Sequence, residues 1–336
     1  MQIAHPYLLF LGDVPDQLAA KTAQGIVDWR REWCLGQLRL PGCQADCGIP
    51  DMTLDAAHAA GARTLVVGVV NAGGVLPDHW VQTIVTAIAL GMDIATGLHQ
   101  RLRDIPEIAL AADQHGVSLF DVRHSTQKFA TGKGTKRPGL RLLTVGTDCS
   151  VGKKYTSLAL ERGMRERGLN ADFRATGQTG VFISGRGIAI DAVVADFIAG
   201  AAEWLSPANE PGHWDVVEGQ GSLCHPSFAG VSLGLLHGSQ PDAFVVCHEP
   251  TRTRMRNVET PIPDIAEIID LTIAAGRLTN PDIRCVGLAI NTKALDDDTA
   301  ARTIADLGAR YGLPACDPIR TGVDPIVDRI VEIFGK

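Results

Sequence analysis

Short, unbroken apolar runs recur along the chain and constrain its fold more than any other feature. They are rich in Val, Leu and Ile, and each ends in Gly or a polar residue: 64–70, 117–123, 140–146, 214–221, 243–250 and 284–292. A strand that is buried on both faces needs apolar side chains at every position, so such runs are typical of parallel sheets. Segments with helical character lie between them, including 79–92, 154–168 and 299–312. The alternation predicts an α/β fold.

Chain length favours two such domains rather than one. The 336 residues exceed what a single core usually organises. The stretch "HSTQKFATGKGTKRPG" at 124–139 is polar, contains Gly and Pro, and has no apolar periodicity, which is typical of a linker. We therefore predict an N-terminal domain over 1–125, a linker over 126–137 and a C-terminal domain over 138–336.

Charge and composition indicate which classes of molecule the protein binds. A formal charge of -7 provides no general attraction to nucleic acid or anionic membranes. The start of the chain, "MQIAHPYLLFLGDVPDQ", has no basic leader or cleavage site and predicts a first strand instead. No apolar run reaches the length of a membrane-spanning helix. Scattered cysteines suit a reducing compartment. We expect a cytoplasmic protein that binds a small molecule and neither nucleic acid nor membrane.

The strongest functional signal is "LLTVGTDCSVGKKYTSLALERG" at 142–163. Gly146 ends a buried run, and Gly152 and Lys153 begin a helix. In phosphate-binding loops, glycines let backbone N–H groups converge on the phosphate, and the lysine adds charge. An ordinary strand-to-helix turn is the alternative interpretation. The predicted phosphate-binding residues are Gly146, Thr147, Asp148, Cys149, Ser150, Val151, Gly152, Lys153, Lys154, Tyr155 and Thr156.

This loop departs from the common pattern at Lys154, where nucleotide hydrolases and kinases have a Ser or Thr that binds Mg²⁺. Thr156, two positions on, would face another part of the helix. A second lysine suits charge-based binding of a phosphate without a metal. We therefore expect no metal, and a phosphate that is held rather than transferred.

Three later segments contain further candidate site residues. The glycine-rich start of 174–205 contains Arg174, Thr176, Gln178 and Thr179, and an amphipathic helix is predicted from about Asp191. The segment 216–242 contains Glu218, Gln220, Ser222 and His225 at the end of a strand, where ligands bind in open α/β sheets. Arg252 and Arg254 follow the next run and could grip an acidic substrate. Solvated arginines and a packed histidine are the alternative interpretations.

Several motifs together resemble one family. "NAGG", "GLH", "DVR", "VGTDCSVGKKYT", "RATGQTG", "VEGQGSLCHPSFAGVSLGLLHGS" and "CHEPTR" are similar to the bacterial D-glutamate N-acetyltransferases, over about residues 7–300. The resemblance implies a Rossmann-like N-terminal domain and a P-loop C-terminal domain. It also implies acetyl transfer from acetyl-CoA to the amine of D-glutamate, with D-glutamine as a further acceptor. The product, N-acetyl-D-glutamate, would pass to an epimerase, and the protein would be a dimeric or tetrameric homo-oligomer.

Under this interpretation the loop holds the phosphates of coenzyme A. Amine acetylation needs a base and donors for the developing oxyanion. Glu218, and then His225, are the candidate bases, and backbone N–H groups of 219–222 are candidate donors. Arg174, Arg252 and Arg254 would hold the substrate carboxylates, and Cys149 could carry the acetyl group.

Two other functions stay open from the residues alone. The first is an ATP-dependent ligase or small-molecule kinase of the dethiobiotin-synthetase type, which would need Mg²⁺. The second is a nucleotide sensor without catalytic activity.

Overall fold

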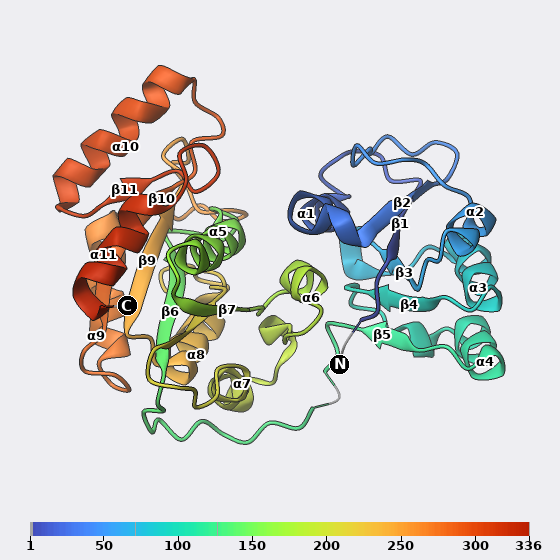
Figure 1. Ribbon diagram of the computed structural model, residues 1–336, viewed down its shortest axis with the longest axis horizontal. Coiled ribbons are helices and arrows are strands. Elements are labelled where there is room, and N and C mark those ends of the chain that lie inside the picture. Colours follow the sequence, from blue (N-terminus) through green and yellow to red (C-terminus); the bar gives the residue numbers. More distant parts are fainter. Residues whose placement is uncertain (1–2, 71, 126, 336) are drawn as a thin grey trace. The chain divides into compact units, whose positions relative to one another are not determined.

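A computed structural model describes residues 3–70, 72–125 and 127–335 and divides the chain into two compact units (Figure 1). The first unit comprises the chain up to Gln127 together with Gly177–Ala192. The second unit comprises Lys128–Thr176 and the chain from Val193 onward. The sequence had placed Gly177–Ala192 in the C-terminal domain with its neighbours. In the structure this segment packs with the N-terminal unit.

The first unit is built on a parallel sheet with the strand order β2-β1-β3-β4-β5. Strand β1, which lies between β2 and β3, is buried at every position, as the unbroken apolar run predicts. The strands are β1 (Tyr7–Gly12), β2 (Cys34–Arg39), β3 (Thr64–Val67), β4 (Asp93–Thr96) and β5 (Leu119–Asp121).

Two helices of the first unit, α2 and α4, begin or end at residues that favour helix termini. Thr53 caps the start of α2 by accepting the N–H of Ala56, and Pro106 occupies the first turn of α4. Gly116 ends α4 in the left-handed conformation that glycine adopts without strain. The helices are α1 (Lys21–Arg30), α2 (Leu54–Ala59), α3 (Val81–Ala89) and α4 (Pro106–His115).

The segment Gly177–Ala192 adds a short helix, α6 (Gln178–Ser184), to the first unit. This helix packs against α1, and the hydroxyls of Thr22 and Thr179 share a hydrogen bond of 3.2 Å. The sequence suggested a glycine-rich loop here. Because Phe182 and Ile183 are buried, the apolar side chains of "GVFIS" favour a helix over a loop.

The second unit contains a parallel sheet with the strand order β11-β10-β9-β6-β8-β7. Its interior strands β8 and β9, which flank β6, are almost entirely buried. The strands are β6 (Leu140–Gly146), β7 (Asn170–Arg174), β8 (His213–Val217), β9 (Ala243–His248), β10 (Arg284–Ile290) and β11 (Ala315–Cys316). The two parallel-sheet units confirm the predicted α/β class.

Helices cover both faces of this second sheet. Helix α5 packs on β6, β7 and β8, and α11 lies beside it. Side chains of α7, α8 and α9 form a separate core with Leu143, Phe244 and Leu288 of the strands. The helices are α5 (Lys153–Glu166), α7 (Ile198–Leu205), α8 (Ala229–Ser239), α9 (Ile265–Gly276), α10 (Asp297–Tyr311) and α11 (Asp324–Phe334). Of the residues that the structure describes, no helix is both long and apolar enough to cross a bilayer.

The amphipathic helix expected from about Asp191 begins later, at Ile198. Asp191 belongs instead to a single 3-10 turn at Ile190–Ala192, and Val194 is extended, with φ -58° and ψ 136°. The prediction of this helix start was wrong because the chain leaves the first unit at Ala192 and enters the second at Val193. A helix that continued through this point could not serve both units.

The predicted linker has no regular secondary structure, but hydrogen bonds hold its C-terminal end to the second unit. Lys136 donates to Asp242 over 2.7 Å, and Arg137 donates to the backbone carbonyl of Ser206 over 3.0 Å. The backbone N–H groups of Lys133 and Gly134 donate to Glu203. Residues 133–137 therefore belong to the second unit. Residue 126, where the predicted linker begins, lies outside the described residues.

Candidate functional site

The candidate site of the second unit lies where neighbouring strands end. The end of β6, Gly146, pairs in register with Cys247 of β9. Glu218 directly follows β8, the other neighbour of β6. The carboxyl ends of parallel strands meet at one edge of the sheet, so the segments 146–156, 218–225 and 248–256 come together there.

The loop after β6 has the backbone of a phosphate-binding loop. Ser150 and Gly152 adopt positive φ angles, 58° and 110°, before α5 begins at Lys153. The Lys153 side chain points into the loop, where its Nζ donates to the carbonyl of Asp148 over 2.7 Å. Burial lowers the pKa of this ammonium from its ordinary value. The loop therefore surrounds a cation in a water-poor setting.

Asp148 is the structural centre of the loop. Its fully buried carboxylate accepts hydrogen bonds from the N–H of Cys149 (2.7 Å), from the Arg252 guanidinium (2.7 Å) and from the N–H of Arg256 (2.8 Å). Burial alone would raise the pKa of Asp148, but these hydrogen bonds outweigh it and hold the pKa below its usual value. Asp148 thus ties the loop to the segment after β9.

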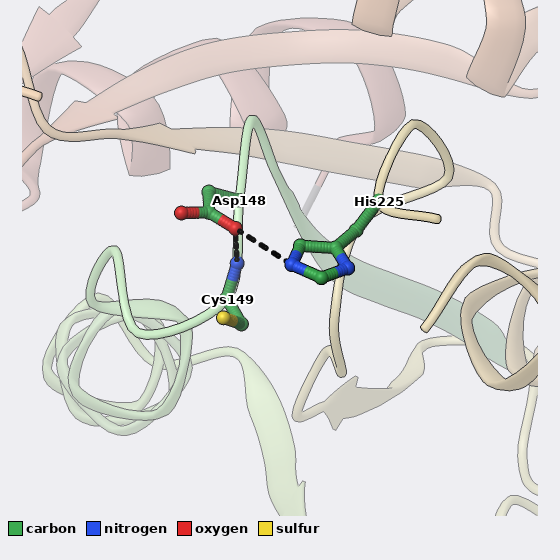
Figure 2. A group of neighbouring side chains, drawn as sticks. All are labelled: Asp148, Cys149 and His225. Carbon is green, nitrogen blue, oxygen red and sulfur yellow. Dashed lines mark hydrogen bonds and ion pairs between the residues drawn. The ribbon is translucent and has the colours of Figure 1, made fainter. Parts of the chain in front are cut away.

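Asp148, Cys149 and His225 also bring three potential metal-ligand atoms within 4.8 Å of one another. Figure 2 shows the Asp148 carboxylate next to the Cys149 N–H and the His225 ring, whose Nε2 lies 3.8 Å away. These three ligand atoms do not fit a metal cation, because the Arg252 guanidinium already neutralises the Asp148 carboxylate. The arrangement instead suits a structural role, in which the Asp148 carboxylate holds the loop in place beside an anion site.

The hydroxyl of Thr156 is directed away from the loop opening. It donates to the carbonyl of Gly152 over 3.1 Å and accepts from the Cys247 thiol. The nearest hydroxyl to the usual Mg²⁺-binding position is therefore engaged in hydrogen bonds within the protein. The Lys154 ammonium lies 4.7 Å from the centre of the Tyr155 ring.

Glu218 is buried beside polar groups at the end of β8. The side chain is 4% exposed, and its Oε2 accepts the N–H of Thr176 over 3.0 Å. The hydroxyl of Thr176 donates to the Glu218 carbonyl and accepts from Gln220 Nε2 over 3.0 Å. A Cβ atom on Gly219 would lie 1.6 Å from the carbonyl oxygen of Thr144, which explains why glycine follows Glu218.

His225, the second candidate base, has both ring nitrogens engaged. Nδ1 accepts the N–H of Ser227 over 3.1 Å, so the ring proton is on Nε2 and is donated to the carbonyl of Arg256 over 3.1 Å. The ring is 1% exposed. Both ring nitrogens of His225 are therefore already used in hydrogen bonds within the protein.

The arginines expected to hold a substrate carboxylate already bind carboxylates of the protein. Arg174 pairs with Asp215 over 2.7 Å, and Arg252 with Asp148. Arg254 is exposed and pairs with Glu259. Sequence reasoning could not foresee these pairs, because each partner is identified only when the chain is folded.

The remaining predicted residues divide between the two units. Gln178 and Thr179 belong to the first unit, whereas Thr176, Gln220 and Ser222 belong to the second. The Ser222 hydroxyl, which is buried, accepts the N–H of Cys224 over 3.3 Å. Burial and the charge of Asp148 raise the pKa of the Cys149 thiol, which disfavours its use as a nucleophile. Asn71 of the "NAGG" motif lies outside the described residues.

Arg256 and His248, which end β9 or follow it, also border the loop. Arg256 donates from Nη1 to the Ser150 hydroxyl over 2.9 Å, and its backbone N–H binds Asp148. His248 lies with Nδ1 3.1 Å from the Thr147 hydroxyl, and burial lowers the pKa of this imidazole. Only the pairing of β9 with β6 shows that they border the loop.

A parallel α/β sheet with a glycine loop and lysine after its central strand defines the second unit as a P-loop domain. Family comparison agrees with this class. Residues 38–125 match a domain of unknown function described as DUF1611_N, a Rossmann-like domain. Residues 128–327 match the DUF1611 C-terminal P-loop domain.

The chain belongs to the DUF1611 family. It is 53% identical to a D-glutamate N-acetyltransferase from a Pseudoalteromonas species, over 97% of this chain and 99% of the relative. It is 48% identical to a D-glutamate N-acetyltransferase from Tritonibacter scottomollicae, over 98% of this chain and 100% of the relative. A crystal structure of a DUF1611 family protein from Anabaena variabilis superposes with a TM-score of 0.86 at 32% identity, covering 97% of this chain and 99% of that one. These findings confirm the predicted family.

Proposed function

We propose that this protein transfers the acetyl group of acetyl-CoA to the amine of D-glutamate and forms N-acetyl-D-glutamate. The high identity to two D-glutamate N-acetyltransferases over nearly the whole chain carries this proposal. The loop geometry supports it, because phosphate groups of a CoA thioester can be held by backbone N–H groups and cations without phosphoryl chemistry.

The charges around the loop favour an anionic ligand. Lys153, Lys154, Arg252 and Arg256 lie in or beside the loop, against the carboxylates of Asp148 and Glu249. On formal charges this leaves two positive charges in excess. The diphosphate and 3′-phosphate of coenzyme A are anions that this positive excess would attract, and the pairing of Asp148 with Arg252 keeps the carboxylate from opposing them.

The reaction requires a neutral amine near a thioester carbonyl. The amine nitrogen forms a bond to the carbonyl carbon, the carbon–sulfur bond breaks, and the thiolate of CoA leaves and takes up a proton. Glu218 is our candidate for the base that accepts the amine proton. The turn at 219–222 is our candidate for stabilising the carbonyl oxygen. Because Thr144 Oγ1 accepts the Gly219 N–H over 2.9 Å, the donors would come from residues 220–222.

Release of free CoA thiol tests the proposal. The purified chain would be incubated with acetyl-CoA and D-glutamate, L-glutamate, D-glutamine or no acceptor, each with and without ATP and Mg²⁺. We expect thiol release with D-glutamate that does not depend on ATP. ADP formation without thiol release would instead identify an ATP-dependent ligase or kinase, and ligand binding with no product would identify a sensor.

Three further statements rest on the sequence and remain predictions. The N-acetyl product would be consumed by an epimerase, the protein would form a homo-oligomer, and it would act in the cytoplasm. Coupled assays, light scattering and fractionation test them in turn.

A further inference from the structure

Two buried polar side chains of the second unit converge on the backbone of a single residue, Arg256. Asp148 accepts the N–H of Arg256 over 2.8 Å, and Nε2 of His225 donates to the carbonyl of Arg256 over 3.1 Å. The exposed fractions of Asp148 and His225 are 0% and 1%. Burying such groups costs free energy unless they are hydrogen-bonded, and the backbone of Arg256 supplies a partner to each. The fold therefore fixes the position of this one residue.

The side chain of Arg256 extends from this fixed backbone to the phosphate-binding loop. Its Nη1 donates to the Ser150 hydroxyl over 2.9 Å. In the described part of the chain, Ser150 is one of three non-glycine residues with a positive φ, at 58°. This conformation is uncommon for a residue with a Cβ atom, and it lets successive backbone N–H groups converge on an anion. The guanidinium thus lies beside the part of the loop that is shaped for an anion.

Arg256 differs from the neighbouring arginines in its lack of a carboxylate partner. Arg252 pairs with Asp148, and Arg254 pairs with Glu259. Among the described residues, no carboxylate forms an ion pair with Arg256, and Nε and Nη2 of its half-buried side chain make no hydrogen bond within the protein. A guanidinium with such donors can bind a phosphate through two parallel hydrogen bonds.

The charge around the loop indicates how many phosphates the ligand carries. Lys153 and the backbone N–H groups at the start of α5 are suited to one phosphate. A further cation next to Ser150 is suited to a ligand with more than one. Under the proposed function the acetyl donor is such a molecule, because coenzyme A carries a diphosphate and a 3′-phosphate.

We propose that Arg256 binds a phosphate of the acetyl donor through its guanidinium, and that Asp148 and His225 are positioning residues that hold Arg256 beside the loop. This gives the buried His225 a role that needs no proton transfer. The proposal rests on the proposed function for the identity of the donor. The diphosphate and the 3′-phosphate offer the same oxygen acceptors to a guanidinium, so donors that lack one or both distinguish them.

The decisive variant is Arg256→Met, which removes the guanidinium and leaves both backbone hydrogen bonds in place. Thiol release would be measured with acetyl-CoA, with acetyl-dephospho-CoA, which lacks the 3′-phosphate, and with acetyl-pantetheine, which lacks every phosphate. We expect kcat/KM for acetyl-CoA to fall roughly ten- to a hundredfold. The value for acetyl-pantetheine should stay within about twofold, and the KM for D-glutamate and the thermal midpoint should not change.

The other donor identifies the phosphate. A fall for acetyl-dephospho-CoA as large as that for acetyl-CoA would place Arg256 at the diphosphate, whereas a fall confined to acetyl-CoA would place it at the 3′-phosphate. Arg256→Lys keeps the charge but not the planar pair of donors, so its loss should be smaller. Arg329→Met is the matched control. Arg329 is an exposed arginine of the same unit, paired with Glu332, and its loss should leave every donor unaffected.

A second variant, His225→Phe, tests the positioning role, because it keeps a ring beside Phe228 and removes the Nε2 donor. It should lower kcat/KM for acetyl-CoA in the same direction and leave acetyl-pantetheine within about twofold. The double variant with Arg256→Met should be no worse than Arg256→Met alone, since both act through one guanidinium. An equal fall with acetyl-pantetheine would overturn the positioning role of His225.

An unchanged kcat/KM for acetyl-CoA in Arg256→Met, or an equal fall with acetyl-pantetheine, would overturn the proposal. Titration calorimetry with coenzyme A separates it from the proposed function, since binding needs no acetyl transfer. If the wild-type chain releases no thiol but binds coenzyme A, and Arg256→Met weakens that binding at least tenfold, only the proposed reaction fails. If the wild-type chain neither binds coenzyme A nor releases thiol, both fail.

Discussion

We expect anion binding at the loop to depend most on Lys153. Its ammonium is enclosed by the loop and contacts a carbonyl oxygen rather than a carboxylate. A phosphate would replace that weak partner with a charged one. We therefore expect Lys153→Met to raise the KM for acetyl-CoA at least tenfold, measured by thiol release. The exposed Lys293 offers a control, since Lys293→Met should leave this KM unchanged. An unaltered KM in Lys153→Met would contradict CoA binding at the loop.

The lowered pKa of Lys153 also predicts how donor binding depends on pH. Because burial favours the neutral amine, the charge is lost at a lower pH than for an ordinary lysine. The KM for acetyl-CoA should rise with pH in the alkaline range, below the usual lysine pKa. Lys153→Arg keeps its charge there, so its KM should be flatter over the same range. Parallel profiles for the two proteins would contradict this assignment.

Glu218 is the residue expected to accept the amine proton. Gln at this position retains an oxygen for the Thr176 N–H, so the local fold should persist while the base is lost. We expect Glu218→Gln to lower kcat roughly a hundred- to ten-thousandfold. The control is Glu210→Gln, an exposed carboxylate of the same unit. If steady-state kcat is unchanged in Glu218→Gln, another group is the base.

Asp148 should make the stability of the fold depend on pH. Its pKa is held below the unfolded value, so its carboxylate stabilises the fold at neutral pH, and this contribution is lost as pH falls through the lowered pKa. Asp148→Asn should reduce the free energy of unfolding by about 2–4 kcal/mol at pH 7. The difference from wild type should shrink at acidic pH. Urea unfolding at both pH values measures it, and a difference that grows in acid would contradict the assigned sign.

At the scale of elements, the close approach of α7 and α8 depends on glycine. A Cβ atom on Gly238 would lie 2.1 Å from the carbonyl oxygen of Ala199, whereas one on Gly230, in the same helix, meets nothing within 4 Å. Gly238→Ala should therefore destabilise the protein by about 3 kcal/mol. Gly230→Ala should stabilise it by about 0.5–1 kcal/mol through helix propensity. Thermal or urea unfolding of the pair checks this, and equal effects would mean that the helices are free to separate.

At the scale of the whole molecule, the first unit is discontinuous in the sequence. A fragment that ends at Gln127 lacks α6 and two hydrogen-bond partners of Arg123, Gln178 and Asp191. We expect such a fragment to melt at a lower temperature than the same fragment joined to residues 177–192 through a flexible Gly/Ser linker. Circular dichroism melting compares the two. Equal midpoints would show that the added segment contributes little to the first unit.

Local signals predicted much of the fold. The runs at 140–146 and 284–292 correspond to β6 and β10, and the helical segment 154–168 corresponds to α5. The loop at 146–156 was found because glycine, lysine and a preceding buried strand are adjacent in sequence. The start of α7 was missed because Val193 marks a change of unit, which has no local signal in the composition.

Sequence patterns alone were enough to predict the α/β class, the loop and the family, since each depends on residues within one turn or strand of each other, or on motifs in a set order. Which charged groups remain available depends on the folded chain. Arg174 is paired with Asp215, Arg252 with Asp148 and Arg123 with Gln178, over separations of 41, 104 and 55 residues. Such pairs depend on which strands become neighbours, so a side chain that looks available in the sequence can be committed in the fold.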